Sequence, residues 1–189
     1  MNILLDLLGS TLIGSVIFML VINLNIFTHS ALYTSDGELK LQQNAKTLAE
    51  ILNYDLRKIG YKCDSTYVPM IIADSNRVKF YSDLDKNGSI DQLEFCLSNS
   101  GTVAQTQNPR DIILYRIFNG DTLKGPSLGL TKLKFSYMNQ FKQNTFALDS
   151  IKYIQAQIYV ESDYEVENIF GVMEYQKTYW EMTINPRNL

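Results

Sequence analysis

The segment from Asp83 to Glu94 carries oxygen-bearing side chains at regular intervals. They stand at positions one, three, five, seven, nine and twelve of the segment: Asp83, Asp85, Asn87, Ser89, Asp91 and Glu94. Gly88 holds position six, where a tight calcium loop makes a sharp turn. Ca²⁺ takes six to eight oxygen ligands, and this spacing is that of a calcium-binding loop. The segment is therefore a candidate calcium site, with the Ser89 backbone carbonyl as one of the oxygens.

The flanks of this loop predict strands, whereas an EF-hand has helices on both sides. Residues 77–82 and 93–98 alternate polar and apolar side chains with the period of a strand. The loop would then join two strands of a hairpin, where Asp, Asn and Gly are also ordinary turn residues. A polar turn explains Asn87 and Gly88 but not the four acidic side chains. Both interpretations stay open, and we expect no obligatory cofactor.

A long apolar segment begins the chain, from about Leu7 to Phe27. About 20 such residues are long enough to cross a hydrocarbon core roughly 30 Å thick. We therefore expect a membrane-spanning stalk over residues 1–30 and one domain over residues 31–189, and the charges before the stalk do not determine on which side of the membrane the domain lies. A cleaved signal peptide, ending near Ala31, is the weaker interpretation, because no Lys or Arg precedes the apolar segment.

A second helix is predicted from about residue 38 to residue 59. Its apolar residues recur at intervals of three and four, on one helix face: Leu41, Ala45, Leu48, Leu52, Leu56 and Ile59. Gly60 follows, as is common where a helix ends. Residues 35–38 fit a capping box, and Gly37 weakens a helix. The stalk and this helix are thus either one rod with a weak point or two helices.

The rest of the chain predicts strands separated by polar loops. Beside the two hairpin strands, we expect strands over residues 68–73, 111–118, 133–138, 151–161 and 174–184. A helix followed by strands predicts an α+β domain, with an antiparallel sheet packed on the helix. In the second hairpin strand Leu93, Phe95 and Leu97 share the face toward the helix, so Cys96 points away. Cys63 and Cys96 form a candidate disulfide, with two free thiols as the alternative.

The composition argues against several classes of function. The 189 residues carry a net charge of −3 with acidic and basic residues interspersed, so nucleic-acid binding has no basic patch to use. The single histidine, His29, lies at the end of the stalk, so the domain has no histidine-based triad. There is no phosphate-binding glycine loop and no Cys/His zinc cluster. We expect no enzyme and no small-molecule substrate, with a hydrolase as the remote alternative.

Four stretches are similar to a known family. Residues 9–13, Gly-Ser-Thr-Leu-Ile, resemble the processing site of type IV pilins and type II secretion pseudopilins. Residues 41–46 and 55–61, with Cys63, look like the end of the first helix in minor pilins of the PilW and GspJ kind. Residues 184–189, Ile-Asn-Pro-Arg-Asn-Leu, resemble how such chains finish. The match covers the N-terminal third and the last few residues.

The resemblance implies a bacterial inner-membrane protein that crosses the membrane once, with its domain outside the cytoplasm. It implies cleavage of a prepilin leader between Gly9 and Ser10, methylation of the new N-terminus, and partners that are the membrane and other pilin-like subunits. The family's glutamate, five residues into the mature chain, is replaced by Gly14. Gly14 suits a tip or initiator subunit, and it suits equally an unprocessed, membrane-anchored binding module.

Overall fold

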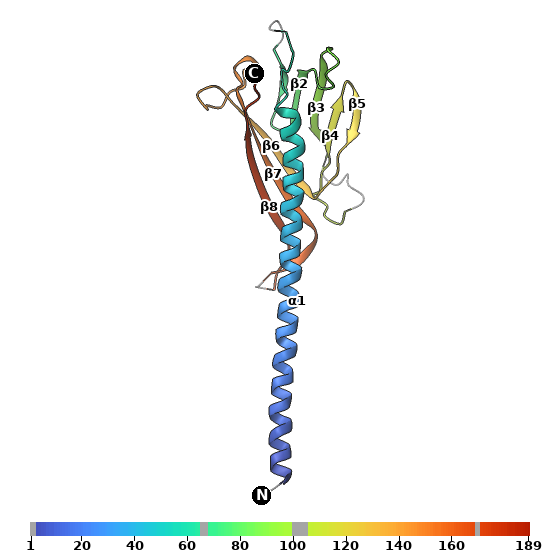
Figure 1. Cartoon of the computed structure of the whole chain (residues 1–189), viewed down its shortest axis with the longest axis vertical. Helices are drawn as coiled ribbons and strands as arrows, with labels where there is room; N and C mark the ends of the chain where they lie inside the picture. Colours follow the sequence, from blue (N-terminus) through green and yellow to red (C-terminus); the bar gives the residue numbers. More distant parts are fainter. Residues whose placement is uncertain (1–2, 65–67, 100–105, 169–170) are drawn as a thin grey trace. The chain divides into compact units, whose positions relative to one another are not determined.

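The computed structural model describes residues 3–64, 68–99, 106–168 and 171–189 (Figure 1). One long helix comes first, and strands with one short 3₁₀ helix follow. Their bounds are α1 (Ile3–Leu56), β1 (Met70–Ala73), β2 (Arg77–Ser82), β3 (Asp91–Leu97), β4 (Leu114–Phe118), β5 (Asp121–Lys124), β6 (Leu130–Met138), η1 (Leu148–Ser150), β7 (Tyr153–Glu167) and β8 (Met173–Ile184). The described chain is thus of the α+β class, as the sequence predicts.

The chain divides into two compact units, Met1–Leu39 and Lys40–Leu189. We call these the N-terminal unit and the folded domain. Helix α1 is continuous over 54 residues, so the capping box and Gly37 do not interrupt it. It ends at Leu56, three residues before the expected end at Ile59. Turns follow, and Gly60 adopts the predicted left-handed conformation (φ 74°) while its N–H donates to the Tyr81 carbonyl.

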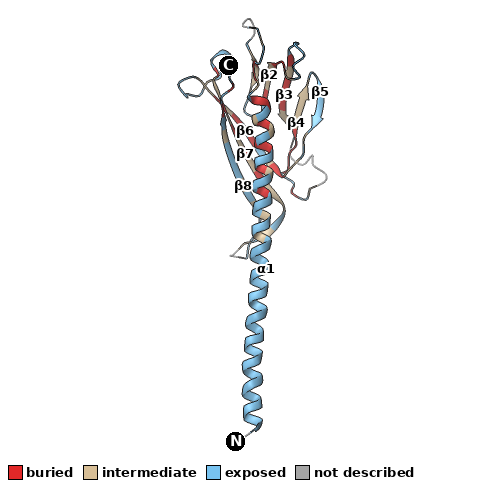
Figure 2. Ribbon diagram, viewed as in Figure 1, coloured by how far each residue is buried: buried red, intermediate tan, exposed pale blue. Residues whose placement is uncertain are grey.

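Most of the N-terminal unit, from Ile3 to Phe27, is exposed and largely apolar helix (Figure 2). Leu12, Phe18 and Leu24 are each 66% exposed. Ile22 is the least exposed of the large apolar side chains from Ile3 to Phe27, and 42% of its surface is still accessible. The hydroxyls of Ser10 and Thr28 donate to carbonyls of the preceding helical turn, so they need no outside acceptor. Within the described residues, α1 is the one helix long and apolar enough to cross a membrane.

The strands form two antiparallel sheets, whereas the sequence pattern predicted one antiparallel sheet. The first has the order β1-β2-β3-β4-β5 and the second the order β6-β7-β8. Strand β5 was not predicted, because all four of its residues are exposed and give no apolar alternation. The remaining strands lie within a few residues of their expected bounds, except that β7 runs on to Glu167.

One apolar core joins the second part of α1 to both sheets (Figure 2). Leu48, Leu52 and Leu56 are at most 1% exposed, and burying one such side chain stabilises the fold by about 1.5–3 kcal/mol. A mostly buried ion pair also links the helix to the first sheet, because the Arg116 Nε in β4 lies 2.7 Å from the Asp55 carboxylate in α1. The predicted apolar stripe is therefore the core face of the helix.

The candidate disulfide between Cys63 and Cys96 is not formed, and both cysteines are free. Gly60, three residues before Cys63, hydrogen-bonds to Tyr81 near the end of β2. Cys96 pairs with Arg77, the first residue of the same strand. Cys63 therefore lies near the last residues of β2, and Cys96 lies beside its first residue. Partial burial raises the pKa of each thiol, which keeps both protonated at neutral pH.

Among the described residues the core begins at Leu41, so the folded domain should not need the N-terminal unit. We expect a chain beginning at Ser30 to be soluble and to unfold in one cooperative transition, followed by circular dichroism during heating. In that chain Leu52→Ala should lower the free energy of unfolding by about 2–5 kcal/mol, because it opens a cavity in the core.

The matched control is Glu50→Ala, on the exposed side of the same helix, where the ion pair to Lys46 is solvated. It should change the free energy of unfolding by less than about 0.5 kcal/mol. Aggregation of the shortened chain, or equal effects of the two substitutions, would show that α1 does not supply the core.

Candidate functional site

The candidate calcium loop joins β2 to β3 in a hairpin, as the sequence predicts. The strands are antiparallel, with Ser82 opposite Asp91 and Phe80 opposite Leu93. Four side chains of these strands have no exposed surface: Val78, Phe80, Leu93 and Phe95. This buried face fixes the register, because a slip by one residue would turn every apolar side chain outward. Residues 83–90 are thereby held as the loop.

Asp83, the first loop residue, is buried. Its side chain has no exposed surface, and its Oδ2 accepts hydrogen bonds from the Lys62 Nζ at 2.8 Å and the Gly88 N–H at 3.2 Å. Its own N–H donates to the Tyr61 carbonyl. Its Oδ1 is buried and has no hydrogen-bond partner among the described residues. One oxygen of this carboxylate is therefore ion-paired and the other is left without a donor.

Asp85 and Asn87 shape the exposed part of the loop. The Asp85 carboxylate accepts from the Asn87 N–H at 3.0 Å and from the Asn87 Nδ2 at 2.7 Å. The Asn87 Oδ1 in turn accepts from the Ser89 N–H at 2.6 Å. Lys86 and Gly88 have positive φ angles of 64° and 88°, which carry the chain around the turn. The loop is thus curled by its own side chains.

Asp91 closes the loop from β3 and is 3% exposed. One of its oxygens accepts from the Leu84 N–H at 3.0 Å, and the other accepts from the Asn119 Nδ2 at 2.8 Å. Asn119 lies in the turn between β4 and β5, and its Oδ1 accepts from the Gln92 N–H. Sequence reasoning missed Asn119 and Lys62 as parts of the site. The Asn-Gly pair at 119–120 signals only a tight turn.

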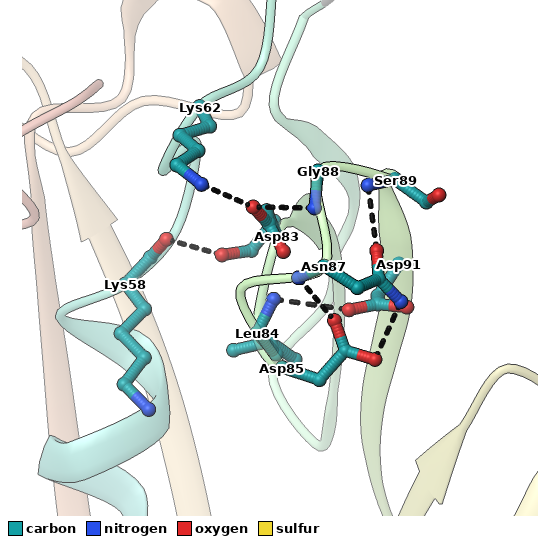
Figure 3. A network of polar contacts seen from close by, with 10 residues as sticks. Lys58, Lys62, Asp83, Leu84, Asp85, Asn87, Gly88, Ser89 and Asp91 are labelled. Atoms are coloured by element: carbon teal, nitrogen blue, oxygen red, sulfur yellow. Dashed lines mark hydrogen bonds and ion pairs between the residues drawn. The ribbon is translucent and has the colours of Figure 1, made fainter.

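Three of the predicted ligands come together. Carboxylate oxygens of Asp83, Asp85 and Asp91 all lie within 4.8 Å of one another, and Figure 3 shows their side chains gathered where the loop curls. The side chain of Asn87 and the backbone of Ser89 lie in the same network. The arrangement offers oxygen atoms alone, which suits a hard cation such as Ca²⁺.

Glu94, the sixth predicted ligand, is not brought to this group. Its carboxylate pairs with the Arg77 Nε at 2.6 Å and lies 3.8 Å from the Lys79 Nζ. On a helix, residues three apart share a face, but on a strand they point to opposite faces. Because Asp91 and Glu94 both belong to β3, the twelfth position cannot act as it does in a helix-flanked loop. The ion pairs with β2 are the role that the structure gives Glu94.

The candidate processing site belongs to the N-terminal unit. Gly9 and Ser10 are both helical and exposed, and a Cβ added at Gly9 would meet no other atom within 4 Å. The hydroxyl of Ser10 donates to the Leu7 carbonyl at 2.9 Å. The bond between Gly9 and Ser10 therefore lies in regular helix.

The electrostatics of the loop depend on Lys62. Its hydrogen bond is the main cause that lowers the pKa of Asp83 below its ordinary value, and Asp83 in turn raises the pKa of Lys62. Asp83 is therefore ionised at neutral pH. Among the described residues, the ion pair between Lys62 and Asp83 is the only one that involves any of the three carboxylates. The group keeps an excess of negative charge, which a bound cation would offset.

We expect Lys62→Met to lower the melting temperature at pH 7 and to have a smaller effect in acid. A carboxyl whose pKa is lowered by folding contributes stability above its unfolded value near 3.8, and this contribution disappears as the pH falls through the folded value. The measurement is the difference in melting temperature between the two proteins from pH 7 to pH 2.5. A difference that does not change with pH would rule out a role for the Lys62–Asp83 charge pair.

No protein-family model, curated protein or solved structure matches the chain. The similarity of residues 9–13, 41–46 and 55–61 to pilin-like chains therefore stays a prediction from the sequence.

Proposed function

We propose that the chain is a minor, pilin-like subunit of a filament of the type IV pilus or type II secretion class. Before assembly, the N-terminal part of α1 would hold it in the bacterial inner membrane with the folded domain outside the cytoplasm. The observation that carries the proposal is the division of one helix. The first part of α1 is apolar and exposed, and the second part, from Leu41 to Leu56, supplies the core of the folded domain.

The first support is the cost of exposing this surface to water. Apolar side chains from Ile3 to Phe27 are 42–83% exposed, whereas soluble monomers rarely show apolar patches beyond a few hundred Å². Lipid or other apolar helices must therefore surround this segment. Its backbone is paired within the helix, and its Ser and Thr hydroxyls bond to preceding carbonyls. It can enter lipid without leaving these groups unsatisfied.

The second support is the length and the small residues of α1. A simple anchor needs about 20 residues, whereas α1 has 54 and continues into the folded domain. Gly9 and Gly14 leave open space beside the helix. Small residues let apolar helices approach closely, so other α1 helices are suitable partners. A bundle of such helices is what a filament core requires.

Gly14 decides which place in a filament fits best. The family's glutamate at this position is expected to pair with the N-terminal amine of a neighbouring subunit. An acidic side chain without that partner is costly in lipid. A chain with Gly14 lacks this link, so we assign it to the tip or to initiation.

A second candidate function is an unprocessed, single-pass binding module that never enters a filament. The same observation favours it, since a permanent anchor has no use for a carboxylate at Gly14. The stretch before the apolar segment carries Asp6 as its one charged side chain, whereas prepilin leaders usually carry Lys or Arg. The mature N-terminus separates the two functions.

We expect the mature chain to begin at Ser10 with a methylated amine, as processing by a prepilin peptidase would leave it. The measurement is mass spectrometry of the N-terminal peptide of protein purified from membranes of its own host. A blocking substitution, Gly9→Val, should leave the leader in place and serves as the control. An intact Met1 in the unsubstituted protein would favour the anchored module, and a start after Ala31 would indicate a signal peptide.

We expect Gly14→Glu to lower the amount of protein inserted in the membrane without increasing its share in filaments. The central cost of an acidic residue is about 2.5–3.5 kcal/mol, and Gly14 lies toward one end of the apolar segment, so the low end applies. The measurement is quantitative blotting of membrane and sheared-filament fractions.

Gly14→Gln is the matched control, because it adds the same bulk without the charge. It should reduce insertion less than Gly14→Glu does. Enrichment of the Glu variant over the Gln variant in sheared filaments would indicate a body subunit that benefits from the carboxylate, which contradicts a place at the tip.

A further inference from the structure

We propose that the loop between β2 and β3 binds one Ca²⁺ through Asp83, Asp85 and Asp91, and that Lys62 partly neutralises the site when the ion is absent. The site lies within the folded domain. It does not depend on the proposed function, because a membrane anchor and a filament subunit would contain the same loop. The convergence of the three carboxylates and a buried, unpartnered oxygen carry the proposal together.

The unpartnered oxygen is the Oδ1 of Asp83. The side chain of Asp83 has no exposed surface, so bulk solvent does not reach this atom. A buried acceptor left without a partner costs about 1–3 kcal/mol, and more when it is charged. Its other oxygen is already bonded to Lys62 and Gly88. In Figure 3 the carboxylate lies beside the curled loop that holds Asp85 and Asp91, so a cation among them would supply the missing partner.

The charge balance points to a divalent ion. Three carboxylates lie within 4.8 Å of one another. Among the described residues they form one ion pair, that of Asp83 with the Lys62 ammonium group. The remaining excess of about two negative charges is concentrated at a mostly buried site, where like charges repel strongly. A divalent cation offsets the whole of this excess, whereas a monovalent cation would offset only half of it.

The donor set favours Ca²⁺ over other metals. The three converging side chains offer hard oxygen atoms, with no His or Cys for zinc or copper. Ca²⁺ accepts irregular sets of six to eight oxygens, whereas Mg²⁺ demands a near-ideal octahedron. Three carboxylates on a curled loop therefore suit Ca²⁺ better than Mg²⁺. Water and loop oxygens such as the Ser89 carbonyl would complete the coordination.

The site connects three segments that are distant in the sequence. Asp83 is bonded to the turn that follows α1 through Lys62 and Tyr61. Asp91 is bonded to the β4–β5 turn through Asn119. A bound ion would hold the loop between these two contacts, so its effect should appear as greater stability of the folded domain. The exposed Lys62 ammonium group can turn toward solvent when the ion enters.

The test is thermal unfolding of the full chain in detergent micelles, with either free CaCl₂ or a chelator in the buffer. At a hundredfold excess of free Ca²⁺ over its dissociation constant, we expect a rise in melting temperature of about 5–10 °C. Asp85→Asn should abolish this rise when its melting temperature in Ca²⁺ is compared with its own value in chelator, because the substitution removes one carboxylate from the group.

Glu165→Gln is the matched control, since it makes the same carboxylate-to-amide change at an exposed position in β7. It should keep the full rise with Ca²⁺. Lys62→Gln should tighten Ca²⁺ binding measured by titration calorimetry, because it removes the competing positive charge. It should do so at least severalfold, and more at low salt than at high salt.

Equal melting temperatures in Ca²⁺ and chelator, for both the unsubstituted protein and Lys62→Gln, would overturn the proposal and leave the loop as a polar turn. A rise that survives Asp85→Asn would place the ion elsewhere. An equal rise with Mg²⁺ at the same free concentration would overturn the choice of Ca²⁺. None of these results depends on the mature N-terminus or on recovery in filaments, so they leave the proposed function untouched.

Discussion

The rest of the structure depends on the packing of one apolar stripe, from Leu41 to Leu56 of α1, into the core of the folded domain. Both sheets present apolar residues to that core, and the Asp55–Arg116 ion pair adds a charged contact between helix and sheet. The stripe ends where the core ends, although the helix does not. The same helix carries exposed apolar side chains from Ile3 to Phe27, and under the proposed function lipid or other helices cover them.

Much of this architecture could be predicted from residue periodicity. The stripe, the left-handed Gly60 and the strand pair around the loop follow from local patterns whose physical causes act within a few residues. The two-sheet arrangement could not be predicted, because alternation shows which face of a strand is buried but not which strand lies beside it. Gly37 left open whether the helix would break, and α1 is continuous there because a glycine costs a helix only about 1 kcal/mol.

Part of the candidate metal site could likewise be predicted from the sequence, and part could not. The spacing of Asp83, Asp85 and Asp91 predicted three groups that the loop does bring together. Glu94 followed a template whose last ligand lies on a helix, and the strand directs it to Arg77 instead. Lys62 and Asn119 carry no local signal of their role, because they reach the site only through the tertiary packing of the turns after α1 and β4.

We propose that one helix is covered in two different ways, by lipid or other helices in its first part and by its own domain in its second. Hydrogen–deuterium exchange of the full chain in lipid nanodiscs tests this most directly, because it reports amide protection along α1. We expect strong protection from Leu7 to Phe27 and again from Leu41 to Leu56, with faster exchange between them. After the lipid is replaced by a denaturant-free buffer with mild detergent, the second protected segment should persist unchanged. Exchange from Leu7 to Phe27 as fast as in the intervening residues, with lipid present, would contradict the account.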